Sequence, residues 1–227
     1  MGISQQIGSS SLSKPGVCTS STRPATPYEG QMIYETDTDL SYIYGNSAWQ
    51  QIAGSTAVGN SGLVYVTQAS WVSGGILSVN NCFTSTYTNY RLVIRNAKHA
   101  TTSVNLLFRL RAGGTDTGGT GYYYGRQYIA MGGASGGTAG ASAAAEIIPG
   151  IVAATANAGS GVMDIFDPQL AAVTTTTFQG VWATTTGEAS AGSGLLNNTT
   201  QYDGFSLHAN TGNLTGLTVY VYGYRNA

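Results

Sequence analysis

The sequence predicts an all-β protein in three parts: an extended N-terminal arm over residues 1–26, a small β-meander with a linker over residues 27–60, and a jelly-roll-like antiparallel β-sandwich over residues 61–227. Two observations predict this fold. Short segments of alternating apolar and polar residues recur between turns rich in Gly and Asn. No segment of helical length shows a 3.6-residue apolar period with capping residues.

The arm is polar and shows no periodicity. Pro15, Pro24 and Pro27 keep it extended, because a proline disfavours helix in the residue before it. The arm has no apolar core of its own, so we expect any order in it to come from contact with another chain. We expect it to anchor the protein in its assembly.

The meander is expected to contain three short strands and two turns, at residues 31–35, 36–39, 40–44, 45–48 and 49–52. A sheet of this size is only marginally stable by itself. We therefore expect its apolar side chains to be covered by other copies of the chain or by a host surface. The candidate contact residues here are Tyr42, Tyr44 and Trp49.

The main domain is expected to contain strands over residues 90–95, 104–111, 161–167, 177–183, 204–209 and 217–225. Residues 131–161 depart from this pattern, since Gly, Ala, Ser and Thr dominate around a short apolar run at residues 147–152. One interpretation is a long loop with an edge strand, because Pro149 is poorly placed in a central strand. The other is a projecting loop that contacts a neighbouring subunit.

Four arginines form a candidate contact surface. If the strands over residues 90–95 and 104–111 pair, their outward arginines lie close together on one face; these are Arg91, Arg95, Arg109 and Arg111. The face is either solvated or a subunit contact partly neutralised by acidic residues of a partner.

Residues 122–128 form a second candidate contact, because three consecutive tyrosines adjoin an arginine and a further tyrosine. Exposed aromatic rings beside a guanidinium can stack on the sugars of a cell-surface glycan, and Tyr123 and Arg126 are the candidates. The alternative is that alternate tyrosines pack inside the sandwich while the others cover it.

Composition argues for a protein that meets other proteins. Charged residues make up 8% of the chain, against roughly 25% in a typical soluble protein. Nine basic and ten acidic residues do not supply the excess of positive charge that general nucleic-acid binding needs. We expect no membrane-spanning segment and no secretory signal. Cys18 and Cys82 are expected to be free thiols, consistent with assembly in a reducing cytosol.

No catalytic set is recognisable in the sequence, so the expectation is a non-enzymatic protein without cofactor or metal. His99 is placed in a turn and His208 on an outward position, both with structural roles. Asp164 and Asp167 fall on opposite faces of a strand, which makes them a poor glycosidase pair. Glu188 has no obvious partner. The run Asp37-Thr38-Asp39 lacks the later ligands of a calcium loop and indicates a tight turn.

Two segments resemble virion proteins of tailed bacteriophages. The stretch RPATPYEGQMIYETDTD, followed by Asn46-Ser47-Ala48-Trp49, resembles a module near the N-termini of tail-fibre and minor structural proteins. The C-terminal part is similar to domains in the same setting, through residues 88–91, 108–116, 203–205 and 222–226. The resemblance implies a virion structural protein assembled in the bacterial cytoplasm, and it brings no functional residues. Residues 40–44 are more apolar than the usual pattern, which suggests burial against a partner.

Two placements on the particle follow. In the first, the protein decorates or cements the head by binding the major capsid protein; the absence of a long repetitive shaft favours this placement. In the second, it is a short tail fibre or receptor-binding tip that binds tail proteins and host glycan. A glycan-degrading enzyme is a third hypothesis and would need a carboxylate pair. We expect a homotrimer, because three copies around an axis would cover the meander and the charge-poor surface.

Overall fold

A computed structural model of the chain describes residues 15–53, 62–71, 74–100, 104–133, 136–155, 157–182 and 187–225. Residues 1–14 of the expected arm and residues 54–61 of the linker lie outside the described residues. The described chain contains strands and no helix, which confirms the all-β prediction. It divides into two compact units between Ser61 and Gly62, and each is considered by itself.

Unit 1 is a four-stranded sheet in the order β1-β2-β3-β4, made of β1 (Gly16–Cys18), β2 (Met32–Glu35), β3 (Leu40–Gly45) and β4 (Ala48–Ala53). The three predicted strands of the meander are present to within one residue at most ends. The turn over residues 36–39 is also as predicted, and Asp39 has the positive φ of 55° that such a turn uses.

The arm prediction was wrong for residues 16–26, which fold onto the meander of the same chain. β1 pairs in parallel with β2, so that Val17 lies opposite Tyr34. The backbone N–H of Ser20 donates to Asp37 Oδ1 over 2.9 Å, and the Arg23 guanidinium pairs with Glu35. These partners are far apart in sequence, so the local residue pattern of the arm could not predict the contacts.

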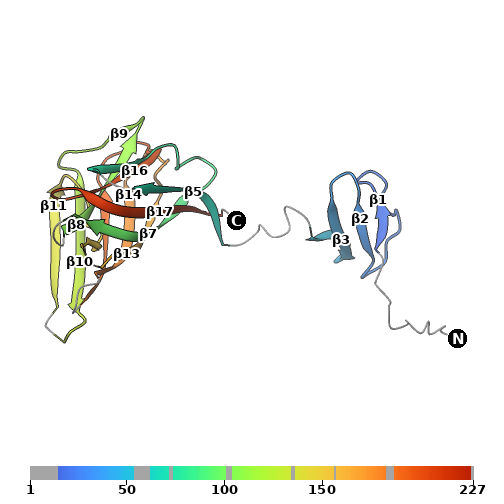
Figure 1. The fold of residues 1–227 in the computed structure, drawn as a ribbon. Helices are drawn as coiled ribbons and strands as arrows, with labels where there is room; N and C mark the ends of the chain where they lie inside the picture. Colours follow the sequence, from blue (N-terminus) through green and yellow to red (C-terminus); the bar gives the residue numbers. More distant parts are fainter. Residues whose placement is uncertain are drawn as a thin grey trace. The chain divides into compact units, whose positions relative to one another are not determined.

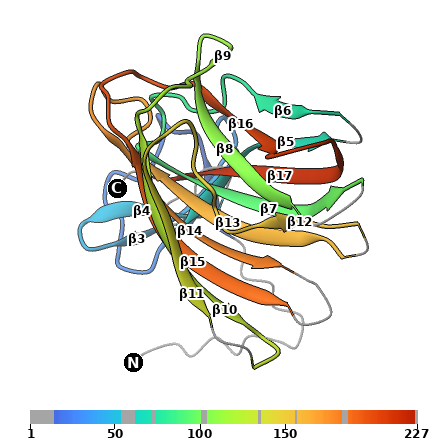
Figure 2. The ribbon, with the colours of Figure 1, turned by 90° about the vertical axis from the view of Figure 1, so that its left-hand side faces the viewer.

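Unit 2 is a sandwich of two unequal sheets (Figures 1 and 2), which confirms the predicted fold class. The larger sheet has eight strands in the order β11-β10-β15-β14-β13-β7-β17-β5. Its strands are β5 (Leu63–Trp71), β7 (Asn89–His99), β10 (Tyr122–Ala130), β11 (Gly137–Ala144), β13 (Gly159–Phe166), β14 (Thr174–Trp182), β15 (Glu188–Leu196) and β17 (Leu214–Tyr224). The smaller sheet has the order β12-β8-β16-β6, with β9 paired to β8. Its strands are β6 (Ile76–Val79), β8 (Val104–Ala112), β9 (Thr115–Asp116), β12 (Val152–Ala153) and β16 (Gly204–Ala209).

The core lies between the two sheets and is centred on aromatic rings. Phe205 of β16 stacks between Phe83 and Phe108, with ring centroids 5.8 and 5.9 Å away. Tyr90 of β7 lies 4.7 Å from Phe83 and is fully buried. The predicted inward positions of β7 and β8 are confirmed, because alternate residues from Tyr90 to Ile94 and from Val104 to Leu110 are buried.

The apolar run inside residues 131–161 is packed in this core and does not project; Val152 at its end begins β12, a two-residue edge strand of the smaller sheet, as the first interpretation expected. Ile147, Pro149 and Ile151 are buried. Ile147 exchanges backbone hydrogen bonds with Phe108 over 2.9 and 3.1 Å. Residues 131–161 also contain β11, an edge strand of the larger sheet that was not predicted because it carries only Gly, Ala, Ser and Thr.

Glycines on the inner face of the larger sheet make room for this run. A Cβ on Gly180 would lie 2.5 Å from the carbonyl oxygen of Gly150, and one on Gly161 would lie 2.7 Å from the Cδ1 of Ile151. Ser190 of β15 donates from its hydroxyl to the Gly150 carbonyl over 2.8 Å. The small residues of β13, β14 and β15 therefore allow a buried segment to approach the sheet at main-chain distance.

The two cysteines are free and belong to different units. Cys18 is half-buried in β1, whereas Cys82 is buried, and burial raises the pKa of the Cys82 thiol to about 12. We expect an aromatic disulfide reagent to modify one thiol per native chain, at Cys18, and both thiols in denaturant. Peptide mapping after labelling identifies the site; rapid labelling of Cys82 in the native protein would contradict the described packing.

Candidate functional site

The predicted cluster of four arginines does not form. Arg91 and Arg95 lie on β7 of the larger sheet, and Arg109 and Arg111 lie on β8 of the smaller sheet. The two strands face each other across the core, so their outward side chains leave the sandwich on opposite sides. The prediction was wrong because it assumed that two strands adjacent in sequence pair with each other.

Arg91 is held in place within unit 2. Its Nε and Nη2 donate to the two carboxylate oxygens of Asp164 on β13, both over 2.7 Å, and the Tyr224 hydroxyl donates to the same carboxylate over 2.7 Å. Burial raises the pKa of Asp164, but the hydrogen bonds from Arg91 and Tyr224 outweigh it and hold this pKa below its usual range. Arg95, further along β7, is exposed.

The arginines of β8 also have partners in the chain. Arg109 Nη2 lies 2.8 Å from Glu146 Oε2, which is 3.0 Å from the Nε2 of His208. Burial lowers the pKa of His208, although the Glu146 carboxylate favours its charged form. Arg111 pairs with Asp116 and donates from Nε to Asn80 Oδ1 over 2.9 Å.

His99 ends β7 and is buried, with its Nε2 2.8 Å from the Thr211 carbonyl oxygen. The structure therefore places both histidines among structural contacts, although His99 lies in a strand and not in a turn. Among the described residues, no group of three or more His, Cys, Asp or Glu side chains is arranged to hold a metal ion. The described part of the chain also has no helix long and apolar enough to cross a membrane.

Tyr123 and Arg126 lie on opposite faces of β10. Tyr122 is buried against the core, and its hydroxyl accepts from the Leu110 backbone N–H over 2.9 Å. Arg126 follows on that same inner side, where its Nη1 is 3.9 Å from Glu188 and its guanidinium lies 5.4 Å from the Tyr128 ring centroid. Glu188 thus has the partner that the sequence did not show. Tyr123 alone points outward, and 37% of it is exposed.

The three aromatic candidates of unit 1 share one face of its sheet, and that face is covered from within the chain. The Arg23 guanidinium lies 4.4 Å from the Tyr42 ring centroid and pairs with Glu35. Tyr44 and Trp49 pack edge to face, with ring centroids 5.3 Å apart. The Arg23 hydrogen bond also lowers the pKa of Glu35.

The other face of unit 1 is open and apolar, and it lies outside the predicted contact residues Tyr42, Tyr44 and Trp49. Cross-strand pairs place Val17 beside Tyr34 and Met32 beside Ile43 on this face. Val17 is 66% exposed and Met32 is 38% exposed. Alternation along residues 32–35 separates Met32 and Tyr34 from Ile33 and Glu35, so the period of two could have identified part of this face.

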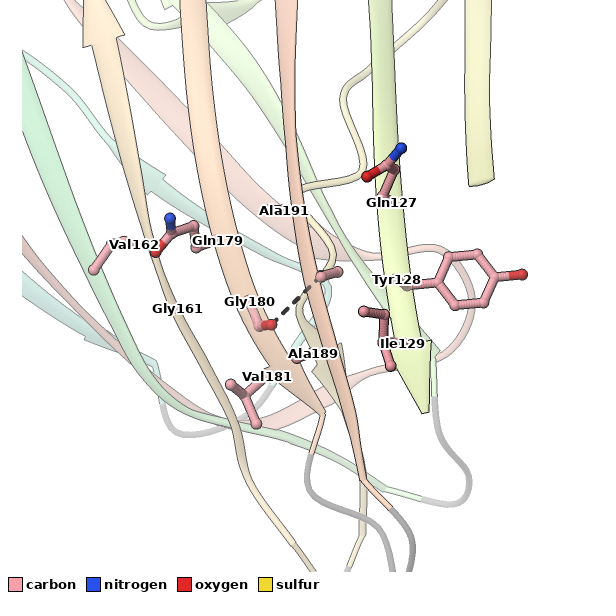
Figure 3. Close-up of a pocket in the computed structure, with 11 residues that line it drawn as sticks. Gln127, Tyr128, Ile129, Gly161, Val162, Gln179, Gly180, Val181, Ala189 and Ala191 are labelled. Carbon is pink, nitrogen blue, oxygen red and sulfur yellow. Dashed lines mark hydrogen bonds between the residues drawn. The ribbon is translucent and has the colours of Figure 1, made fainter. Parts of the chain in front are cut away.

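A trough runs along β15 on the outer face of the larger sheet. The outward side chains of β15 are small near its start, at Ala189, Ala191 and Ser193, whereas its neighbours β10 and β14 carry longer ones. Figure 3 shows Gln127 and Ile129 on one side of this strand and Gln179 and Val181 on the other. The depression here has a volume of about 500 Å³.

The fold and these surfaces define a two-unit, all-β protein with an open apolar sheet face in unit 1 and a trough in unit 2. No family model, curated protein or solved structure matches the chain.

Proposed function

We propose that this chain is a non-enzymatic structural protein of a tailed-bacteriophage particle, and that it decorates the head. In this proposal unit 1 binds the assembled capsid lattice and unit 2 is displayed on it. The observation that carries the proposal is the open apolar face of unit 1. The resemblance of residues 23–39 to a module of virion proteins supports it.

Unit 1 has too small a core to explain its apolar content. Among its described apolar side chains, Ile33 is the one that is buried, while Val17, Tyr28, Met32 and Ile52 are exposed. An isolated sheet with so little core is marginal in water. One carboxylate borders this face, because the Tyr34 hydroxyl donates to Asp39 Oδ1 over 2.6 Å, whereas Arg23 and Glu35 lie on the covered side. Exposed apolar faces with a polar margin are typical of protein–protein contacts.

The alternative placement is a short tail fibre whose unit 2 contacts a receptor. The specific observation in its favour is the exposed Tyr123 at one end of the β15 trough. The two placements share the structural class and differ in what the particle loses when the protein is absent. A homotrimer, in which three copies cover one another's charge-poor surfaces, belongs to either version of the proposal.

A phage that lacks this protein distinguishes the placements. Because a protein that binds only the assembled lattice stabilises it by mass action, we expect deletion particles to release DNA at a lower temperature and to adsorb to cells at the normal rate. Heat-induced DNA release and adsorption are measured on the same preparation. Normal heat resistance together with failed adsorption would refute head decoration and support the tail fibre.

Complementation with variants tests the attachment face. The double variant V17E/M32E places two charges on the open face and should fail to enter particles, whereas Thr26→Glu, at an exposed loop position of unit 1, should enter normally. Incorporation is measured by quantifying the protein in purified particles. Normal incorporation of V17E/M32E would show that unit 1 attaches by another surface.

A further inference from the structure

The β15 trough is built from three cross-strand rows. Gln127, Ala191 and Gln179 lie directly opposite one another on β10, β15 and β14. The row on one side is Ile129, Ala189 and Val181, and the row on the other is Gly125, Ser193 and Thr177. The floor is therefore Ala, Ala and Ser, with longer side chains on both walls of the first two rows.

The register fixes the size of the trough. Neighbouring strands are about 4.8 Å apart, so the main chains of its two walls are separated by about 9.6 Å. The floor from Ala189 to Ser193 spans about 14 Å along β15 at about 3.4 Å per residue. This width accepts a single ring lying between the walls, and the length accepts more than one ring in a row. The depression over the first two rows, from Ala189 to Ala191, has a volume of about 500 Å³, which lies within the usual range of small-molecule sites.

The polar groups of the trough are two facing carboxamides. The side chains of Gln127 and Gln179 are both exposed, and neither has a hydrogen-bond partner among the described residues. Figure 3 shows them on either side of Ala191, whereas the Tyr128 ring points away from β15. Each carboxamide offers two N–H donors and one oxygen acceptor. Together they can bind hydroxyl groups on both edges of a ring held between them.

The rest of the trough is uncharged. The outward positions of β10, β14 and β15 carry no charged residue; they are Tyr123, Gly125, Gln127, Ile129, Thr175, Thr177, Gln179, Val181, Ala189, Ala191, Ser193 and Leu195. The nearest charged pair along the same rows, Arg91 with Asp164, is already neutralised by its own hydrogen bonds. A charged ligand would lose water here without gaining a counter-charge, so the trough favours a neutral one.

The sheet also disfavours an extended peptide as the occupant. β10, β14 and β15 are interior strands, and their backbone groups are used in pairing with neighbours on both sides. Peptides that add to a sheet need an unpaired edge. A sugar ring needs instead what the trough provides: apolar C–H surface from Ala189, Ala191 and Val181, and amides and hydroxyls at its margins. Tyr123 lies opposite Leu195, beyond the Ser193 end of the trough, and supplies a further exposed ring.

We propose that the β15 trough binds a neutral glycan, with the carboxamides of Gln127 and Gln179 holding a sugar ring over Ala191. The inference holds for either placement of the protein on a particle, because it depends only on unit 2. Head decoration and glycan binding can therefore fail separately.

The test uses the labelled full chain on an array of neutral glucose-, mannose-, galactose- and N-acetylhexosamine-based glycans, with sialylated and sulfated glycans beside them. We expect binding to neutral glycans and none that requires a charged group. Titration calorimetry with the best neutral oligosaccharide should then show at least a tenfold weaker affinity for the double variant Q127A/Q179A, since two hydrogen-bonding groups are removed. Ala191→Trp, which fills the floor, should abolish binding.

Gln68→Ala is the matched control, because Gln68 is an exposed outward glutamine on β5 of the same sheet, outside the trough. It should bind as the wild type does, and thermal unfolding checks that each variant is folded. Absence of binding to every neutral glycan, or unchanged affinity of Q127A/Q179A, would overturn the proposal. Self-association that is lost in Ala191→Trp, without glycan binding, would also overturn it and identify the trough as a contact between copies.

Discussion

Replacing Gly180 by alanine should lower the free energy of unfolding of unit 2 by about 2–3 kcal/mol. The added Cβ would lie 2.5 Å from the Gly150 carbonyl oxygen and 2.7 Å from its carbon, and both belong to main chain. Neither atom can move without shifting the buried segment that packs on the sheet. For a unit of this size, the loss corresponds to a fall in Tm of roughly 4–12 °C, measurable by scanning calorimetry of the full chain.

The same substitution at Gly125 is the control. Gly125 lies in β10 of the same sheet, but its Cβ would point outward and meet no atom within 4 Å. Alanine there should be neutral or should stabilise the protein by a few tenths of a kcal/mol, because it restricts the unfolded chain. Equal effects at the two positions would show that residues 147–154 do not press on β14 as described.

Phe205→Ala should destabilise unit 2 by about 3–5 kcal/mol, the usual cost of removing a large buried ring. Phe205 is fully buried and stacks on both Phe83 and Phe108, so its loss leaves a cavity bounded by rings from three parts of the chain. Urea denaturation, followed by circular dichroism, measures the change. The cavity should also reduce the cooperativity with which the two sheets unfold.

Phe166→Ala provides the comparison for Phe205→Ala, since Phe166 is a half-buried residue of β13 on the outer face of the larger sheet. It should cost clearly less, because part of that ring is already in contact with water. A greater loss of stability at Phe166 than at Phe205 would contradict the position of the core between the two sheets.

Where the chain alternates strictly, the sequence predicted both the strands and the direction of their side chains. Residues 204–209 form β16 with the predicted bounds. The inward positions of β7 and β8 were also correct. In β17, Tyr220, Tyr222 and Tyr224 share one face as expected, and the structure shows that this is the outer face, since Val219 and Val221 are buried. A period of two is a local property, so it can be read without knowing the partner strands.

Strands without this pattern could not be predicted. β11 and β15 are rich in Gly, Ala and Ser, a composition that is equally typical of loops. They are strands because β10 and β14 supply their hydrogen-bond partners, and β15 also needs small residues where Ile147 and Phe178 approach it. The preference of these two segments for β-structure therefore comes from the neighbouring strands and not from their own residues.

The sequence by itself determined the all-β class, the separation of a small N-terminal sheet from a larger sandwich, and the inward sets of the strongly alternating strands. Only the tertiary structure decided which surfaces are formed. Strand order separated Arg91 from Arg109 and assigned Arg23 to cover Tyr42, which left the opposite face of unit 1 open. It also set Gln127 and Gln179 opposite each other across Ala191. The physical reason is that strand register joins residues from distant parts of the chain through backbone hydrogen bonds. Almost every residue type can form these bonds, so the side chains of one segment do not show which segment it pairs with.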